Sequence, residues 1–255
     1  MATIGSHLLA LHAQAGMVIR SSVVDHGGNL GQLLQLDLDI EAWERRLSGR
    51  PEVLQLASAR RELGFAIYAV GTGLYVHAYA GLRLFLELSF ASVYFSANEL
   101  HRRRWVSDRE DFSWTTALDE RDGVLAASFV CEFSASAAAD AEPQAKQAAA
   151  SYRHCSQFIH GKLAVTDALP GTLSYSGPVL ADWLSTAVES ARAVLYLLYA
   201  RYGDELLPND HDGKLADTTK EKLGYWTLDN SVDLHRRCSS TRWLPECRSS
   251  SLLSH

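Results

Sequence analysis

Residues 152–162 combine a permanent cation, an ionisable imidazole and two neutral hydrogen-bonding side chains within two helical turns. Three consecutive alanines at 148–150 precede them and favour a helix. Because each residue of a helix turns by about 100°, Arg153 and His160 lie on one stripe, with Ser156 and Gln157 between them. An imidazole can transfer protons near neutral pH, and a guanidinium can bind phosphate through its planar fork. The stripe therefore places a fixed cation and a potential proton carrier on one polar face of the helix, with the neutral polar side chains of Ser156 and Gln157 between them.

His154 lies about 100° away from this stripe and is a candidate second proton carrier or substrate contact. The opposite side of the helix carries apolar side chains that we expect to face a core: Cys155, Phe158 and Ile159. The alternative interpretation is a polar packing or dimer face, in which Arg153 pairs with a carboxylate and His160 caps a loop. The residues alone leave both interpretations open.

A second polar pair, Arg83 and Glu87, lies four residues apart inside an apolar helical pattern. Such a pair forms an intrahelical salt bridge that contributes little to stability by itself. The apolar surroundings predict that the pair is partly buried, and from there it could orient Arg153 or His160 from behind. A plain structural role is the alternative.

Apolar periodicity predicts the helices that hold these residues. We expect helices over about 52–70, 74–104, 118–136, 144–165 and 179–202, and another that begins near Ile40 with Asp39 as its cap. Breaks are expected at the Gly-containing stretches 27–29 and 71–73. The prediction is an all-α bundle of four or five long helices over residues 41–203, with an N-terminal extension, 1–40, and a partly disordered C-terminal extension, 204–255.

Composition sets limits on the partners. The net charge of -6 gives no overall basic field that would recruit nucleic acid, so any such contact must come from a local patch. The densest basic run is His101-Arg102-Arg103-Arg104. It can hold an RNA backbone, or it can be a solvated helix end that interacts with the helix dipole.

The four cysteines show no Cys-x-x-Cys pairing, which indicates a reducing compartment. Residues 1–20 have no early basic cluster ahead of their apolar residues, so we expect no signal peptide. The apolar run 74–95 contains Arg83 and Glu87, and two charges inside a membrane span are costly. We therefore expect a cytoplasmic protein without a membrane segment. We find no phosphate-binding glycine loop and no zinc-ligand spacing.

With its helices placed, residues 52–202 resemble the HEPN (higher eukaryotes and prokaryotes nucleotide-binding) family of helical domains. Arg153 and His160 fit the family's Arg-x(4–6)-His motif with six intervening residues, and His154 supplies the polar residue usual after the Arg. The preceding helix, 74–95, followed by Trp105, is similar to the Arg-x-x-x-Glu helix of one bacterial branch of the family. One departure is Lys162, which stands where a toxin branch controlled by nucleotidyltransferase antitoxins has a Tyr.

The resemblance implies a metal-independent ribonuclease without a cofactor, acting as a homodimer in which the motif helices of two subunits form one site. Its catalytic residues would be Arg153 and His160, and RNA its substrate. The supporting residues would be the following: His154, Ser156, Gln157, Arg83 and Glu87. A toxin or antiphage effector with an antitoxin or defence-system partner protein is the implied setting. Many family members are inactive, so the alternative is a catalytically silent domain that binds a partner protein or a nucleotide.

Overall fold

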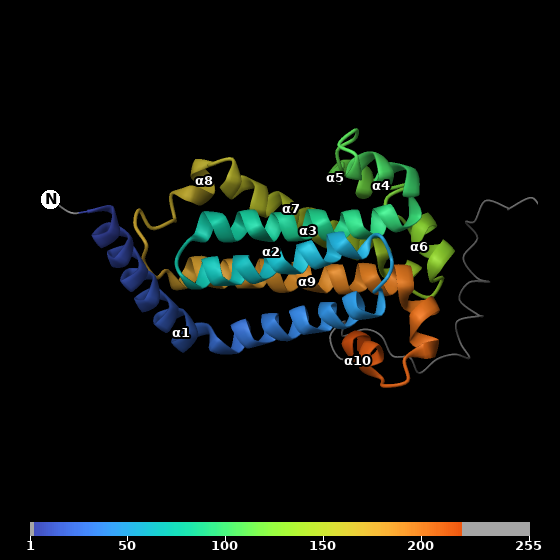
Figure 1. Cartoon of the computed structure of the whole chain (residues 1–255), viewed down its shortest axis with the longest axis horizontal. Helices are drawn as coiled ribbons and strands as arrows, with labels where there is room; N and C mark the ends of the chain where they lie inside the picture. The colour runs from blue at the N-terminus through green and yellow to red at the C-terminus, as the bar shows by residue number, and fades with distance from the viewer. Residues whose placement is uncertain (1–2, 221–255) are drawn as a thin grey trace, which may run out of the picture.

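The computed structural model describes residues 3–220, and every regular element in that range is helical (Figure 1). Five helices are long: α1 (Ile4–Arg46), α2 (Val53–Gly71), α3 (Tyr75–Ala97), α7 (Ala141–Ile159) and α9 (Gly177–Leu206). Shorter helices connect or follow them: α4 (Glu99–Val106), α5 (Trp114–Ala117), α6 (Ala127–Phe133), α8 (Leu163–Thr166) and α10 (Lys214–Lys220), with 3-10 turns η1 (Ala138–Asp140) and η2 (Leu207–Asn209). The predicted all-α bundle of long helices is confirmed.

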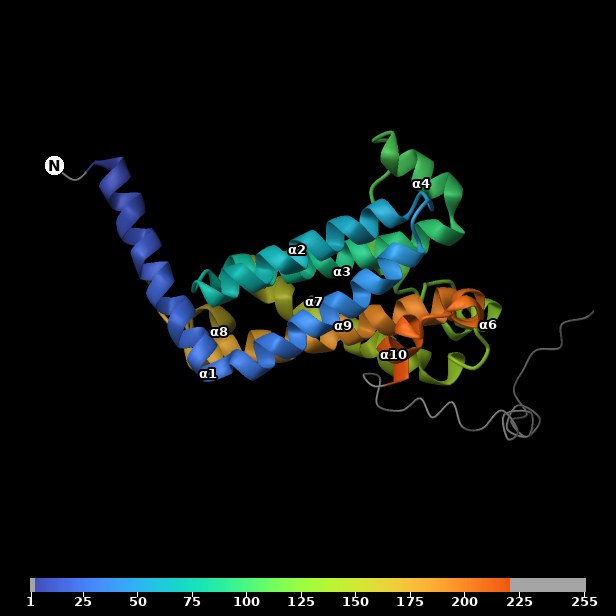
Figure 2. The ribbon, with the colours of Figure 1, turned by 60° about the horizontal axis from the view of Figure 1, so that its bottom comes forward.

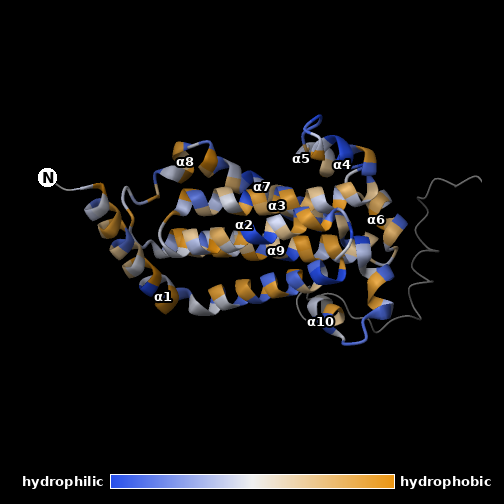
Figure 3. Ribbon diagram, viewed as in Figure 1, coloured by the Kyte–Doolittle hydropathy of each residue, from blue (hydrophilic) through white to orange (hydrophobic). Residues whose placement is uncertain are grey.

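Helix α9 lies at the centre of the bundle because it is apolar on most of its faces. It packs against α1, α3 and α7, and the two ribbon views show these helices around it (Figures 1 and 2). Apolar residues concentrate along α3 and α9, whereas polar residues gather at α4 (Figure 3). The sequence pattern over 179–202 is therefore that of a core helix.

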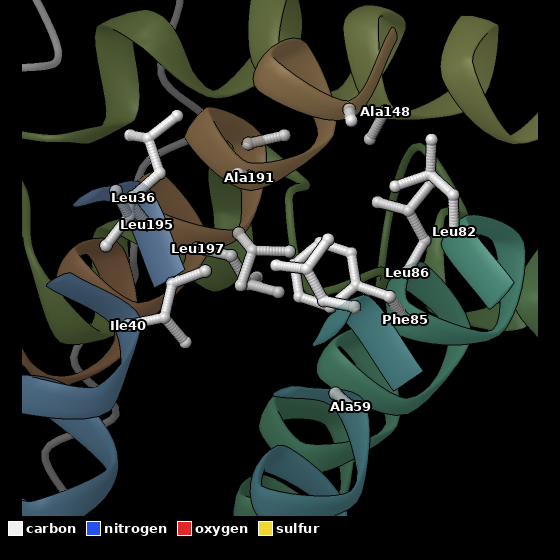
Figure 4. Close-up of a cluster of buried hydrophobic side chains, with 14 of the residues drawn as sticks. Leu36, Ile40, Ala59, Leu82, Phe85, Leu86, Ala148, Ala191, Leu195 and Leu197 are labelled. Carbon is white, nitrogen blue, oxygen red and sulfur yellow. The ribbon is translucent and has the colours of Figure 1, made fainter. Parts of the chain in front are cut away.

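The hydrophobic core brings together side chains from all five long helices. Figure 4 shows Leu36 and Ile40 of α1 facing Leu195 and Leu197 of α9, with Phe85 of α3 on the other side. All five side chains are at most 1% exposed. This continuous core fixes α7 against α3 and α9, and so holds the motif helix in place.

The hairpin of α2 and α3 turns where the glycines predict it. Gly73 adopts φ +84, and the amide of Leu74 donates to the carbonyl of Ala69 at 2.9 Å while Gly73 donates to Val70 at 3.2 Å. These two bonds form a Schellman motif, which ends a helix on a left-handed glycine. The predicted break at residues 71–73 is confirmed.

The division expected at residue 40 falls inside a helix, because α1 spans Ile4–Arg46. Helix α1 consists of two helical segments that meet at a kink at His26 (φ -130, ψ 19), directly before Gly27 and Gly28, and its second half contributes to the core. Asp39, expected as a cap, is buried inside the helix. Two glycines cost a helix about 2 kcal/mol, but burying the α1 side chains against α9 outweighs this. The break predicted at 27–29 is thus observed one residue earlier, as a kink between the two segments of α1.

Two further boundaries differ from expectation. The helix predicted over 74–104 breaks at Asn98 (φ -128, ψ 67), whose side-chain amide donates to the carbonyl of Tyr94 and so competes with the helix. Of the helix predicted over 118–136, only α6 (Ala127–Phe133) forms, and a turn separates it from α5. In this turn Asp119 accepts backbone bonds from Arg121 and Asp122, and a Cβ on Gly123 would lie 2.4 Å from the carbonyl oxygen of Asp119. The tight turn therefore requires a glycine.

The C-terminal extension expected from residue 204 begins inside helix α9. Helix α9 continues to Leu206, and α10 buries Leu215 in the core. The Nε1 of Trp43 in α1 donates to the hydroxyl of Thr218 at 3.0 Å, which ties α10 to the bundle. Residues 221–255, which belong to the region expected to be partly disordered, lie outside the described residues.

Candidate active site

Arg153 and His160 lie on the face of α7 that points away from the bundle, and both are exposed. The amide of His160 still donates to the carbonyl of Ser156 at 3.0 Å, so the helical register reaches the histidine. Between residues 3 and 220 neither side chain makes a hydrogen bond or an ion pair. The pairing of Arg153 with a carboxylate, offered above as an alternative, is not found in this range.

The motif helix ends at Ile159, earlier than the predicted Val165. Gly161 adopts φ +61, its amide donates to Phe158, and the amide of Lys162 donates to Gln157, both at 3.1 Å. This is a second Schellman motif, with His160 as the C-cap. The glycine directly after His160 was the sequence signal for this end. As a result, the imidazole lies at the end of α7, where the chain turns into α8.

The inner side of α7 packs as predicted at two of three positions. Cys155 is fully buried, and Phe158 is 5% exposed and stacks on Tyr79 of α3 with ring centroids 3.7 Å apart. Ile159, expected in the core, is 37% exposed instead. It is the last residue of α7, and the chain turns away after it.

His154 contacts a carboxylate of α9 and aromatic rings of α3 and α7. Its Nε2 lies 2.7 Å from Oδ2 of Asp182 in α9, and the hydroxyl of Tyr79 donates to the same carboxylate oxygen. The imidazole also meets Tyr79 and Phe158 edge-on, with centroids 5.6 and 5.3 Å away. A carboxylate on Nε2 fixes the ring orientation and leaves Nδ1 as the free nitrogen. Burial raises the pKa of Tyr79, and its bond to Asp182 adds to this shift, so the hydroxyl keeps its proton.

Arg83 and Glu87 form the predicted salt bridge at 2.9 Å, and their side chains are 28% and 25% exposed, so the pair is partly buried as expected. The pair binds Tyr152 of α7. Arg83 donates to the Tyr152 hydroxyl at 2.5 Å, and that hydroxyl donates to Glu87 at 2.7 Å. The Tyr152 ring also stacks on Trp114, with centroids 4.1 Å apart. Burial raises the pKa of Tyr152. The pair thus orients the residue before Arg153 instead of contacting Arg153 or His160.

The two remaining supporting residues differ in how far they are free to bind. Ser156 donates its hydroxyl hydrogen to the carbonyl of Tyr152 at 2.9 Å, which leaves only its oxygen lone pairs for a ligand. Gln157 is partly exposed, and its side chain has no hydrogen bond to any residue of the described range. Gln157 is therefore the freer of the two to contact a substrate.

The basic run in α4 is paired with two local carboxylates, Glu99 and Glu110. Glu99 accepts from Arg102 and from Arg103, each at 2.6 Å, and Glu110 contacts His101 and Arg104. The hydrogen bond from Arg102, and after it the smaller contribution of the hydrogen bond from Arg103, lowers the pKa of Glu99 to about 2. These pairs favour the solvated helix end over an RNA-binding patch.

Sequence reasoning missed Asp182, Tyr79 and Tyr152 as members of these clusters. Asp182 lies 28 residues after His154, and no local spacing connects the two. Tyr152 directly precedes Arg153, and its type and position were visible. The inward direction of its hydroxyl became apparent only when α3 was placed beside α7.

Among residues 3–220, no group of three or more His, Cys, Asp or Glu side chains is arranged to hold a metal ion. None of the helices in that range is both long and apolar enough to cross a membrane. No family model, no curated protein and no solved structure matches this chain.

Proposed function

We propose that this chain is a metal-independent ribonuclease of the HEPN type that cleaves RNA as a homodimer through Arg153 and His160. One observation carries the proposal: both side chains are exposed on one face of α7, and neither uses its charge in a contact within the described residues. No hydrogen bond or ion pair within residues 3–220 accounts for these two side chains. A fixed cation can bind a phosphate, and an imidazole can transfer a proton near neutral pH.

The reaction transfers two protons and stabilises one charge. The imidazole of one His160 takes the proton of the 2′-hydroxyl, and the resulting oxygen attacks the adjacent phosphorus. Arg153 stabilises the negative phosphorane through charge-assisted hydrogen bonds. The 5′-oxygen leaves with a proton from a second imidazolium, and the products carry a 2′,3′-cyclic phosphate and a 5′-hydroxyl. Because one chain supplies one imidazole on this face, the second comes from the partner copy of His160.

A dimer would also supply the missing cleft. Arg153 and His160 lie on an outward helix face and line none of five cavities of about 250–530 Å³ on the described surface. Ile159 and Leu163, which flank His160, are 37% and 72% exposed and offer apolar contact area for a second copy. We expect a two-fold axis near this surface.

Light scattering at micromolar concentration tests the dimer. Wild type should be dimeric, and Leu163→Glu should shift it to monomer and abolish cleavage. Leu100→Glu, which changes a 58% exposed leucine of α4, is the matched control and should remain dimeric. A monomeric wild type, or a dimer that Leu163→Glu leaves intact, contradicts the proposed interface.

Incubation of the purified full chain with RNA in EDTA tests the activity. Cleavage should persist in EDTA and disappear in His160→Ala and in Arg153→Ala. Lys146→Ala is the matched control because Lys146 is another exposed cation on α7. An RNA with a 2′-deoxy residue at the cleaved position should resist cleavage, because it lacks the attacking 2′-hydroxyl. Equal RNA decay with wild type and His160→Ala, or no decay at all, overturns the proposal.

A toxin or antiphage effector acting in the cytoplasm, held in check by an antitoxin or defence-system partner protein, is the setting that we propose for this activity. Expression of wild type in bacteria should then arrest growth, and His160→Ala should relieve the arrest. Lys162, in place of a Tyr, argues against control by nucleotide transfer at that position. Equal growth with both proteins would contradict a toxic role.

A catalytically silent HEPN-type binding module is the second candidate. Two observations favour it: the net charge of -6 and the pairing of the α4 arginines with Glu99 and Glu110. Both reduce the attraction for an RNA backbone. Glu99→Gln releases Arg102 and Arg103 and should increase salt-sensitive RNA retention. A silent module would show this retention without any cleavage in the same assay.

A further inference from the structure

The first turns of α1 project from the bundle as an arm, which we define as residues 4–13. Figures 1 and 2 show this arm leaving the end of the bundle that carries α8. Its side chains include Ile4, Leu8 and Leu9, which are 75%, 57% and 71% exposed. Large apolar side chains that gather in the open on one element mark a contact with another molecule.

An apolar stripe along α1 extends beyond the part of it that the chain itself covers. Its positions recur at intervals of four and three residues, which is the spacing of helices that pack against other helices. The stripe comprises the following residues: Ile4, Leu8, Leu11, Ala15, Val18 and Ser22. It is buried at Val18 and Ser22, towards the kink, and exposed at Ile4 and Leu8. The face that packs on the bundle near the kink is thus uncovered in the arm.

A cavity of about 250 Å³ opens beside the base of the arm, between the α2–α3 turn and the segment after α8. Its lining includes Leu74 and Val76 on one side and Leu169 and Pro170 on the other, and no residue of α1. No Asp, Glu, Lys or Arg is among the described residues that line it. These walls suit an aliphatic side chain, which loses contact with water when it enters such a cavity.

The arm of the same chain does not enter this cavity. The side-chain amide of Gln14 donates to the carbonyl of Leu173, and the hydroxyl of Tyr175 donates to Asp25 at 2.6 Å. These bonds fix the base of the arm to the segment after α8. Residues 4–10, which lie beyond them, are all exposed. The arm and the cavity are therefore both open to a second molecule.

Charge favours another copy of this chain as that molecule. Residues 3–24 contain no carboxylate, and Arg20 is their one permanent cation, whereas the whole chain has a net charge of -6. Two copies that meet through the arm and the cavity avoid the repulsion between their acidic bundles. A membrane surface is a poorer match, because interfacial helices are rich in Lys and Arg on their polar face.

The homodimer proposed above also needs more contact area than α8 offers. A stable interface buries about 1,200–2,000 Å², and Ile159 and Leu163 are only two side chains. The arm leaves the bundle at the same end as α8, so both surfaces can belong to one interface (Figures 1 and 2). Because each copy carries an arm and a cavity, a two-fold axis forms the contact twice.

We propose that the arm of each subunit lies across the other subunit of the homodimer, with Ile4 and Leu8 in the cavity between Val76 and Leu169. The inference rests on the homodimer of the proposed function but not on its ribonuclease chemistry. It names the surface that each copy contributes: an aliphatic helix from one subunit and an uncharged cavity from the other.

Analytical ultracentrifugation of the full chain, which measures the dissociation constant of the dimer, tests the contact. Leu8→Lys and Val76→Glu should each raise this constant at least tenfold, because each places an unpaired charge in an apolar contact. The double variant should bind at least fivefold more tightly than either single variant, since each lysine then meets a glutamate of the other copy. Leu54→Glu, which changes a 68% exposed leucine of α2, is the matched control and should shift the constant less than twofold.

Recovery in the double variant also shows that the single variants are folded. An unchanged constant in Leu8→Lys, or a double variant no tighter than the single ones, overturns the arm contact; if Leu163→Glu still gives monomers, the α8 interface stands. A dimer that depends on Leu8 but does not cleave RNA supports the arm contact and overturns the ribonuclease. A monomeric wild type overturns the arm contact, and binding of that monomer to phosphatidylglycerol vesicles would assign the arm to a membrane instead.

Discussion

Phe158 and His160 are two residues apart on α7, and their substitution by alanine should have opposite effects on stability and activity. Phe158 is 5% exposed and stacks on Tyr79, with ring centroids 3.7 Å apart and an angle of 4° between the ring planes. Phe158→Ala therefore removes a ring from between α3 and α7. His160 is exposed and has no side-chain bond to another residue of the described range. His160→Ala therefore removes atoms that already contact water.

The expected magnitudes follow from these environments. A buried Phe→Ala change costs about 3–5 kcal/mol. With about 2–4 °C per kcal/mol for a domain of this size, the melting temperature of Phe158→Ala should fall by about 6–20 °C. An exposed substitution usually stays within about 0.5 kcal/mol, so His160→Ala should shift melting by no more than about 2 °C.

Scanning calorimetry measures the melting temperatures, and RNA cleavage in EDTA, at a temperature where every variant is folded, measures activity. Ile159→Ala is the matched control, since Ile159 lies between the two residues and is 37% exposed. It should destabilise much less than Phe158→Ala and leave cleavage intact. If His160→Ala lowers the melting temperature as far as Phe158→Ala does, His160 is a core residue, and its catalytic assignment fails.

Two further predictions concern Tyr152 and the cysteines. Tyr152→Phe removes the hydroxyl that bonds Arg83 and Glu87 and should lower the free energy of unfolding in urea by about 1–3 kcal/mol; an unchanged midpoint would contradict the cluster. Burial raises the pKa of Cys155 from 9.0 to about 12, so iodoacetamide at pH 8 should label exposed Cys131 in the native protein and Cys155 only after unfolding, as read by peptide mass. Because the folded-state pKa is the higher one, the stabilisation from this neutral thiol is complete below pH 9 and is lost as pH rises towards 12.

The sequence alone determined the features that depend on local periodicity. Arg153 and His160 share a face because seven residues complete almost two helical turns, whatever surrounds the helix. The all-α class and the limits of the α2–α3 hairpin follow in the same way from apolar spacing and from Gly73. The end of α7 was also encoded locally, in Gly161, although periodicity over the following residues predicted a longer helix.

Only the tertiary structure decided the features that depend on distant partners. The second segment of α1 begins at the kink at His26 and keeps Gly27 and Gly28 helical, because packing against α9 outweighs the cost of two glycines, and a local pattern does not contain that packing energy. The same holds for His154, whose partner Asp182 comes from α9, a helix that begins 23 residues after it, at Gly177. Tyr152 binds the Arg83 salt bridge because α3 and α7 lie side by side. Local sequence sets which face a residue occupies, and the packing of helices sets what that face meets.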